Sequence, residues 1–525
     1  MPNTGKPSAG CHLCRTRRVK CDLTRPACRR CVKYGMDCPG YRDTLDLMFR
    51  NRGMGDVKKL ANRRQKVTLP RAQSDSPLVV ASSLSPSPSS AASRPSIALV
   101  LDCYSVVVKG QRYFGLVDFL PVLLAEADEG SCLLYATDTL AGAYIANQTD
   151  SVPDREKASR TYGRALEAVR SALMSPTEST KDETLVSVWA LAAYEILVGS
   201  AQSKRGPGPE AWHLHVGGLN TLLAFRGPGQ FASKRGRKIF WAIHSHILMR
   251  SVLNSAVCPP ESRDLSAMFA AAIMPNPDNH EMSMALVSQF VMNASDIITA
   301  SIVQLRTHFV TVPECITYIH SLDALESIVP QSIYDIYSTE DTAYIWNIYR
   351  TTRMRLHHCV LMLINCALSD FAIDAWEAVD DQEIQILVGR RQGHMEILHS
   401  MAQEILSFVP ATVIQAVRSK PSSPQAADSI PEPAQRSICW ADALRLVWPL
   451  ATIYKLPMVQ EEQRWIARQS CYVIGEQWGI REALKQWSSP VARLPQAIAP
   501  GSIFDQDDWQ EYSPGSMLIT GKSRK

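Results

Sequence analysis

The sequence lacks any long hydrophobic run. Hydrophobic residues make up 46% of its 525 residues, yet no stretch reaches the roughly 18 consecutive apolar residues typical of a membrane-spanning helix. The N-terminus also lacks the apolar core of a secretory signal peptide. We therefore expect an intracellular protein with no membrane partner, whose cysteines stay reduced.

Motifs of familiar enzymes are also missing. The chain has no HExxH motif, no GxSxG nucleophile elbow and no GxGxxG loop after a strand. The pairs His213/His215 and His244/His246 do not replace them, because helical residues two positions apart point about 200° apart. We expect these to be core or surface histidines, and we expect no enzymatic activity.

Charge is balanced only in total. The net charge is +4, but residues 1–72 hold 18 Lys+Arg against 5 Asp+Glu, a net of +13, and the other 453 residues hold 37 against 46, a net of −9. A basic segment of this kind is typical of proteins that contact phosphate backbones. The sequence therefore predicts a nucleic-acid partner.

Six of the 14 cysteines fall within residues 11–38. They form one half-motif written twice: Cys11-x2-Cys14-x6-Cys21-x6-Cys28-x2-Cys31-x6-Cys38. Without a secretory signal, zinc ligation is favoured over three disulfides. Two tetrahedral zinc ions need eight ligand positions, which six sulfurs supply if two of them bridge. A mononuclear zinc ribbon or a chance cluster is the alternative.

This spacing, the basic run between Cys14 and Cys21 and the proline Pro26 resemble the fungal binuclear zinc-cluster family of transcription factors over residues 11–38. The resemblance implies two zinc ions, with Cys11 and Cys28 bridging and the other four cysteines terminal. It also implies that the basic run forms a short helix that reads CGG triplets in double-stranded DNA.

Seven cations of this segment are expected to contact DNA. Arg17 and Arg18 occupy the positions of the base-reading segment, where family members usually carry a lysine. An arginine fork donates to O6 and N7 of guanine together, so the preference beside CGG stays open. The other cations, expected to bind phosphates, are Arg15, Lys20, Arg29, Arg30 and Lys33.

No coiled coil is predicted after the cysteines. Apolar positions in residues 41–68 hold no sustained heptad register, and Gly53 and Gly55 interrupt it. A zipper dimer is therefore not supported, although a homodimer formed elsewhere stays open.

The rest of the chain is a linker, a body and a tail. Residues 74–96 contain ten serines and four prolines, which is typical of a flexible tether. From about residue 99, apolar residues recur three and four apart, which predicts helices; one of them, over about 463–478, should end at Gly479. The predicted division is a flexible N-terminus (1–10), a zinc-cluster DNA-binding domain (11–38), a basic extension (39–72), a Ser/Pro-rich linker (73–98), an α-helical domain (99–490) and a tail (491–525).

Five short body segments resemble the fungal-specific transcription factor domain in their order and spacing: residues 162–166, 182–185, 194–195, 212–218 and 226–228. The resemblance implies a helical regulatory domain for self-association, restraint of activation or response to a signal. In the tail, residues 503–512 alternate acidic and large apolar side chains, a pattern that fits either a coactivator-binding segment or a solvated tail.

The sequence thus predicts a small metal-stabilised binuclear zinc cluster joined by a flexible linker to a predominantly all-α helical regulatory domain. We expect a nuclear, zinc-dependent, sequence-specific regulator of RNA polymerase II transcription at CGG-type sites, with transcription machinery or coregulators as partners. Control of a biosynthetic, secondary-metabolite gene cluster rests on the resemblance alone. The competing hypothesis is a nuclear zinc-containing protein- or RNA-interaction module without sequence-specific DNA reading.

Overall fold

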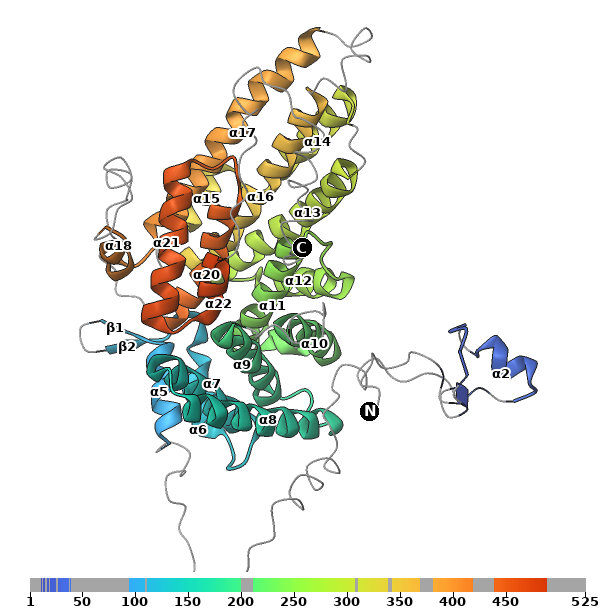
Figure 1. The fold of residues 1–525 in the computed structure, drawn as a ribbon, viewed down its shortest axis with the longest axis vertical. Helices are drawn as coiled ribbons and strands as arrows, with labels where there is room; N and C mark the ends of the chain where they lie inside the picture. Colours follow the sequence, from blue (N-terminus) through green and yellow to red (C-terminus); the bar gives the residue numbers. More distant parts are fainter. Residues whose placement is uncertain are drawn as a thin grey trace, which may run out of the picture. The chain divides into compact units, whose positions relative to one another are not determined.

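The computed structural model forms two compact units, Met1–Ser85 and Pro86–Lys525, which we call the head and the body (Figure 1). It describes residues 11–38, except 12, 15, 16, 18, 25, 26 and 37, and residues 94–108, 111–199, 211–306, 310–338, 342–368, 381–418 and 439–488. The predicted basic extension, the predicted linker up to residue 93 and the acidic-aromatic tail lie outside these residues.

In the head, the described residues include helix α2 (Arg29–Lys33). The first half of the body contains α5 (Pro95–Cys103), β1 (Val106–Val108), β2 (Gln111–Tyr113), the 3-10 helix η2 (Gly115–Val117), α6 (Phe119–Glu126), α7 (Cys132–Thr149), α8 (Val152–Met174), α9 (Asp182–Val198), α10 (Ala211–Arg226), the 3-10 helix η3 (Pro228–Ala232), α11 (Lys234–Asn254) and α12 (Pro260–Ile273). The second half contains α13 (Asn279–Leu305), α14 (Val312–Glu326), α15 (Gln331–Tyr337), α16 (Ala343–Ala367), α17 (Asp381–Ser407), α18 (Ala411–Arg418), α20 (Trp440–Lys455), α21 (Glu461–Trp478) and α22 (Arg481–Ser488).

The body is predominantly helical, as predicted. Among its described residues the strands β1 and β2 form one antiparallel hairpin, in which Val106 pairs with Tyr113 and Val108 with Gln111. Helix ends follow local signals: Asp278 and Glu281 form a capping box at the start of α13, and Gly479, at φ +67°, ends α21 in the left-handed region as expected.

Helix α5 begins earlier than the sequence predicted. It spans Pro95–Cys103, whereas the linker was expected to extend to residue 98. Pro95 was counted as a linker proline, but proline also suits the first turn of a helix, because its missing N–H has no partner there. Ile97 and Val100 of this turn are buried in the body, so this part of the predicted linker belongs to the body.

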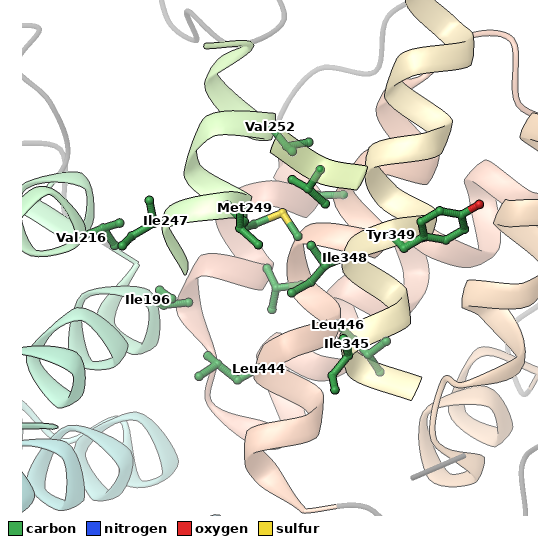
Figure 2. Packing of buried hydrophobic residues seen from close by; sticks show 14 of the residues in the cluster. Ile196, Val216, Ile247, Met249, Val252, Ile345, Ile348, Tyr349, Leu444 and Leu446 are labelled. Atoms are coloured by element: carbon green, nitrogen blue, oxygen red, sulfur yellow. The ribbon is translucent and has the colours of Figure 1, made fainter. Parts of the chain in front are cut away.

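Helix α16 lies at the centre of the core. Of its 25 residues, 22 are buried, as expected of a helix that other helices surround. It packs against α13, α14, α17 and α20 (Figure 1). Figure 2 shows Ile348 of α16 near Met249 of α11 and Leu444 of α20. The body is therefore built around a buried helix rather than a sheet.

Helix α13 has the length and hydropathy of a membrane span, but 56% of its apolar window is buried inside the body. It packs against α16, α11 and α12, and the Phe290 ring on it contacts the Tyr349 ring in a tilted arrangement with centroids 4.5 Å apart. Its apolar composition is thus explained by core packing.

Replacing Gly236 with alanine should lower the free energy of unfolding of the body by about 3 kcal/mol. The new Cβ would lie 2.0 Å from the backbone oxygen of Gln230. That residue cannot easily shift, because its side-chain amide donates to the carbonyls of Gly227 and Leu223. Denaturant unfolding followed by circular dichroism measures the loss.

Gly163→Ala is the matched control for this prediction. Gly163 is exposed in the middle of α8 and has no atom within 4 Å of its virtual Cβ. Alanine there should stabilise the body by about 0.5–1 kcal/mol, the helix-propensity difference. Equal effects of the two substitutions would contradict the steric argument.

Candidate metal centre and nucleic-acid interface

The six cysteine sulfurs of the head form two overlapping groups. Within each group the sulfurs lie within 4.8 Å of one another, and the groups are Cys11, Cys14, Cys21, Cys28 and Cys11, Cys28, Cys31, Cys38. Cys11 and Cys28 belong to both groups, and their Sγ atoms are 3.7 Å apart. The arrangement therefore offers four sulfurs to each of two ions, with two sulfurs shared.

The sulfur spacing fits zinc. Tetrahedral Zn–S bonds of about 2.3 Å place two sulfurs about 3.8 Å apart. The Sγ atoms of Cys14 and Cys28, and those of Cys11 and Cys31, are 3.7 Å apart. The pairs that share an ion are thus already at the required separation.

The two halves of the motif fold alike. The amide of Cys14 donates to Cys11 Sγ at 3.4 Å, and the amide of Cys31 donates to Cys28 Sγ at 3.3 Å. The amides of Cys11 and Cys28 in turn donate to the sulfurs of Cys21 and Cys38, both at 3.5 Å. Amides that point at sulfur stabilise thiolate ligands, and their repetition makes the site pseudo-symmetric.

A tight helix end brings the last cysteine back to the cluster. After α2, Gly35 adopts φ +66°, and its amide donates to the Val32 carbonyl while the amide of Met36 donates to that of Cys31. This is a Schellman motif, which favours glycine at the left-handed position. It reverses the chain and leaves Cys38 beside Cys28.

The cluster is buried although the head is small. Cys11, Cys14, Cys28 and Cys31 are at most 3% exposed. Burial raises the pKa of the Cys14 thiol to about 12. A bound divalent cation is what holds such buried sulfurs as thiolates, so folding and zinc binding are expected to be one event.

Five of the seven predicted DNA-contacting cations are described, and all five side chains are exposed. They are Arg17, Lys20, Arg29, Arg30 and Lys33. Arg15 and Arg18 lie outside the described residues. The described cations are therefore accessible to a nucleic acid.

Arg17, which belongs to the first half-motif, is contacted by side chains of the second. Its guanidinium lies over the ring of Tyr34, 5.4 Å from the centroid, and its Nη1 is 3.6 Å from the sulfur of Met36. Tyr34 is 61% exposed and stands 17 residues after Arg17, at the equivalent place in the second half-motif. Sequence reasoning missed this partner, and only the repeat offset could have indicated it.

Two further contacts tie the head together. The amide of Arg29 donates to Asp22 Oδ2 at 3.1 Å, which caps the first turn of α2. Arg30 Nη1 donates to the Lys20 carbonyl at 3.1 Å. The basic segments of both halves are thus joined directly, not only through the cysteines.

In the body, the short segments that carry the resemblance contact one another. The hydroxyl of Tyr162 donates to Glu195 Oε1 at 2.6 Å and lies 3.0 Å from His215 Nε2, and Arg226 pairs with Asp182. Burial lowers the pKa of His215 to about 4, so this histidine is neutral. It is a core histidine, as predicted.

Two family models match the chain. The fungal Zn(2)-Cys(6) binuclear cluster domain matches residues 9–47, and the fungal specific transcription factor domain matches residues 116–389, about half of the chain. No solved structure matches.

Curated relatives match over limited stretches. An uncharacterized protein of Emericella nidulans is 26% identical over 27% of this chain and 30% of its own length. The aspercryptin biosynthesis cluster-specific transcription regulator of the same species is 57% identical over 7% of this chain and 6% of its own length. A transcriptional regulatory protein of Schizosaccharomyces pombe is 39% identical over 11% and 10%. The matches thus span less than a third of each relative.

The family binds two zinc ions through six cysteines, and its zinc-cluster members bind DNA. Both matched domains occur here in the order that the sequence predicted, and the sulfurs of the head are grouped for two ions. The chain therefore belongs to the fungal Zn(2)-Cys(6) transcription factors that carry a fungal-specific transcription factor domain.

Proposed function

We propose that this protein is a nuclear regulator of RNA polymerase II transcription that reads CGG-type half-sites through its head. The observation that supports this best is the exposed Arg17, held against Tyr34 on a rigid two-zinc scaffold. A fixed guanidinium can donate two hydrogen bonds to guanine, whereas a free one loses conformational entropy on binding. Direct base reading by Arg17 is the central point of the proposal.

In this proposal the cysteines bind zinc and the cations contact DNA. Cys11 and Cys28 bridge the two zinc ions, and Cys14, Cys21, Cys31 and Cys38 complete the sites. Lys20, Arg29, Arg30 and Lys33, together with Arg15, set the register on phosphates, and Arg18 joins Arg17 at the bases. In this proposal the DNA-binding domain spans residues 11–38 of the head, and the regulatory domain begins at residue 94 of the body.

The body is proposed to regulate rather than to catalyse. Its histidines His215 and His244, which contact the Tyr162 and Ser262 hydroxyls, are buried and neutral, which suits packing more than proton transfer. Self-association and recruitment of coregulators or transcription machinery are its proposed roles. The 57% identity to a biosynthesis cluster-specific regulator over 7% of this chain supports a biosynthetic gene cluster as the target.

Arg17→Ala should weaken binding to a CGG duplex by about 10–100-fold, the value of one bidentate base contact. Binding to a scrambled duplex should change much less. Fluorescence anisotropy of the full chain on both duplexes, at two salt concentrations, measures the effect. An equal loss on both duplexes would assign Arg17 to phosphate binding instead.

Lys33→Ala is the matched control, since Lys33 is an exposed cation on α2. It should weaken both duplexes alike and reduce the salt dependence by about one phosphate contact. If the wild-type chain binds CGG and scrambled duplexes equally, the interaction-module hypothesis replaces the proposal.

A further inference from the structure

The body contains a partly open cavity where five helices meet. Its walls come from α9, α10, α11, α16 and α20, from the residue that follows α5 and from Val117 of η2. Figure 2 shows four of its apolar side chains, Ile196, Met249, Ile348 and Leu444, each on a different helix. The volume in which the centre of a water molecule fits is about 80 Å³. One water molecule needs roughly 10–15 Å³ of such volume, so the cavity has room for more than one.

The wall is rich in aromatic rings. The rings of Tyr104 and Trp189 lie 5.5 Å apart, and those of Trp212 and Trp448 lie 5.7 Å apart. All four side chains line the cavity. Rings placed in this way present flat apolar faces and edges, which favour a flat guest.

Three hydrogen-bond donors on this wall have no protein partner among the described residues: the hydroxyl of Tyr104 and the indole Nε1 atoms of Trp189 and Trp212. The three side chains are 3%, 5% and 2% exposed. Buried donors are nearly always satisfied, and the three side chains that carry these donors line the same cavity. A ligand that carries hydrogen-bond acceptors would therefore satisfy donors of this wall.

The ionisable side chains Arg445 and His246 on the cavity wall are either paired with an opposite charge or neutral. Arg445 lines it, but its Nη1 pairs with Asp442 at 3.0 Å and its guanidinium lies 4.6 Å over the Tyr344 ring. His246, also on the wall, is held near the Ala242 carbonyl at 2.8 Å, and burial lowers its pKa to about 4. A charged guest would meet no unpaired opposite charge here, so the wall favours an uncharged one.

We infer that this cavity binds a small, flat, uncharged aromatic molecule whose carbonyl oxygens accept hydrogen bonds from Tyr104, Trp189 and Trp212. The walls of the site include α9 (Asp182–Val198) and α20 (Trp440–Lys455), which are far apart in the sequence. A guest would therefore bridge segments far apart in the sequence. This inference does not depend on DNA reading by the head, because binding is a property of the body.

Acetophenone and ethylbenzene test the inference, because they have nearly the same shape and only acetophenone carries an acceptor. Titration of each into the full chain without DNA, followed by ligand-observed NMR, gives their affinities. Acetophenone should bind saturably and at least about tenfold more tightly than ethylbenzene, since at least one hydrogen bond to a buried donor is gained. Absence of saturable acetophenone binding, or equal affinities, would mean that water alone occupies the cavity and would overturn the inference.

Substitutions locate the binding. Trp189→Phe and Trp212→Phe keep a ring but remove the donor, so each should reduce the preference for acetophenone over ethylbenzene about fivefold. Ala193→Leu, which fills the cavity, should abolish binding of both. Trp241→Phe changes an equally buried tryptophan outside the cavity wall and should change nothing. An unchanged preference in both donor variants would contradict the proposed contacts, even if Ala193→Leu failed to fold.

Discussion

Replacement of Cys28 by alanine is expected to remove both zinc ions from the head. The Cys28 sulfur belongs to both four-sulfur groups, so alanine leaves each ion with three sulfurs. Among the described head residues only cysteines are buried, and no apolar core would remain to keep the fold. Elemental analysis should show zinc falling from two ions per chain to nearly none. Affinity for a CGG duplex should fall at least about a thousandfold, to the nonspecific level.

Two other cysteine substitutions complete the test. Cys38 belongs to one group only, so Cys38→Ala should lose one zinc ion first and keep the other. Cys103 is buried in α5 of the body, and Cys103→Ala should keep both ions. A Cys28→Ala chain that retains two zinc ions would show that the sulfur does not bridge.

The metal centre could be predicted from the sequence because its geometry is local. A Cys-x2-Cys turn places two sulfurs together whatever the rest of the chain does, and the repeat of the half-motif determines how many ions are held. The contact between Arg17 and Tyr34 was not predicted. It exists only after the two halves fold back on each other, and neither residue signals the other by type.

The body shows the same division between local and long-range information. The end of α21 at Gly479 was predicted because it follows from the residue next to the helix end. The hairpin of β1 and β2 was missed, because the apolar residues 106–108 fit a helical pattern as well as a strand. The cavity could not be found at all, since Tyr104, Trp189 and Trp212 are brought together only by tertiary packing.

The body should unfold in mildly acidic solution, near about pH 5, before most carboxylates are protonated. Five histidines have pKa values that burial lowers from 6.5: about 4 for His215 and His246, and about 3 for His244, His358 and His394. A histidine whose pKa is lower in the folded than in the unfolded protein stabilises the fold fully at pH values above its unfolded pKa. This stabilisation is lost as the pH falls toward the folded pKa. Well below pH 6.5, five such groups cost up to about 7 kcal/mol per pH unit, which is comparable to the whole stability of a typical domain.

Tryptophan fluorescence isolates this transition, because all 11 tryptophans lie after residue 188 and zinc loss from the head is therefore silent. His358 is 2% exposed, and its Nε2 has no partner among the described residues. His358→Leu should move the midpoint to lower pH and reduce the proton uptake on unfolding by about one. The same substitution at the exposed His320 should do neither.

If carboxylates rather than histidines controlled acid unfolding, the midpoint would lie at a lower pH. Burial alone would raise the pKa of Glu326, but hydrogen bonds from His357 and Arg353 lower it to about 2. Its contribution to stability is therefore present above its ordinary pKa of 4.5 and is lost only as the pH falls toward 2. A midpoint near pH 3 that His358→Leu leaves unchanged would show that carboxylates control acid unfolding. A midpoint near pH 5 that this variant lowers is expected only if the buried histidines must take up protons when the core opens.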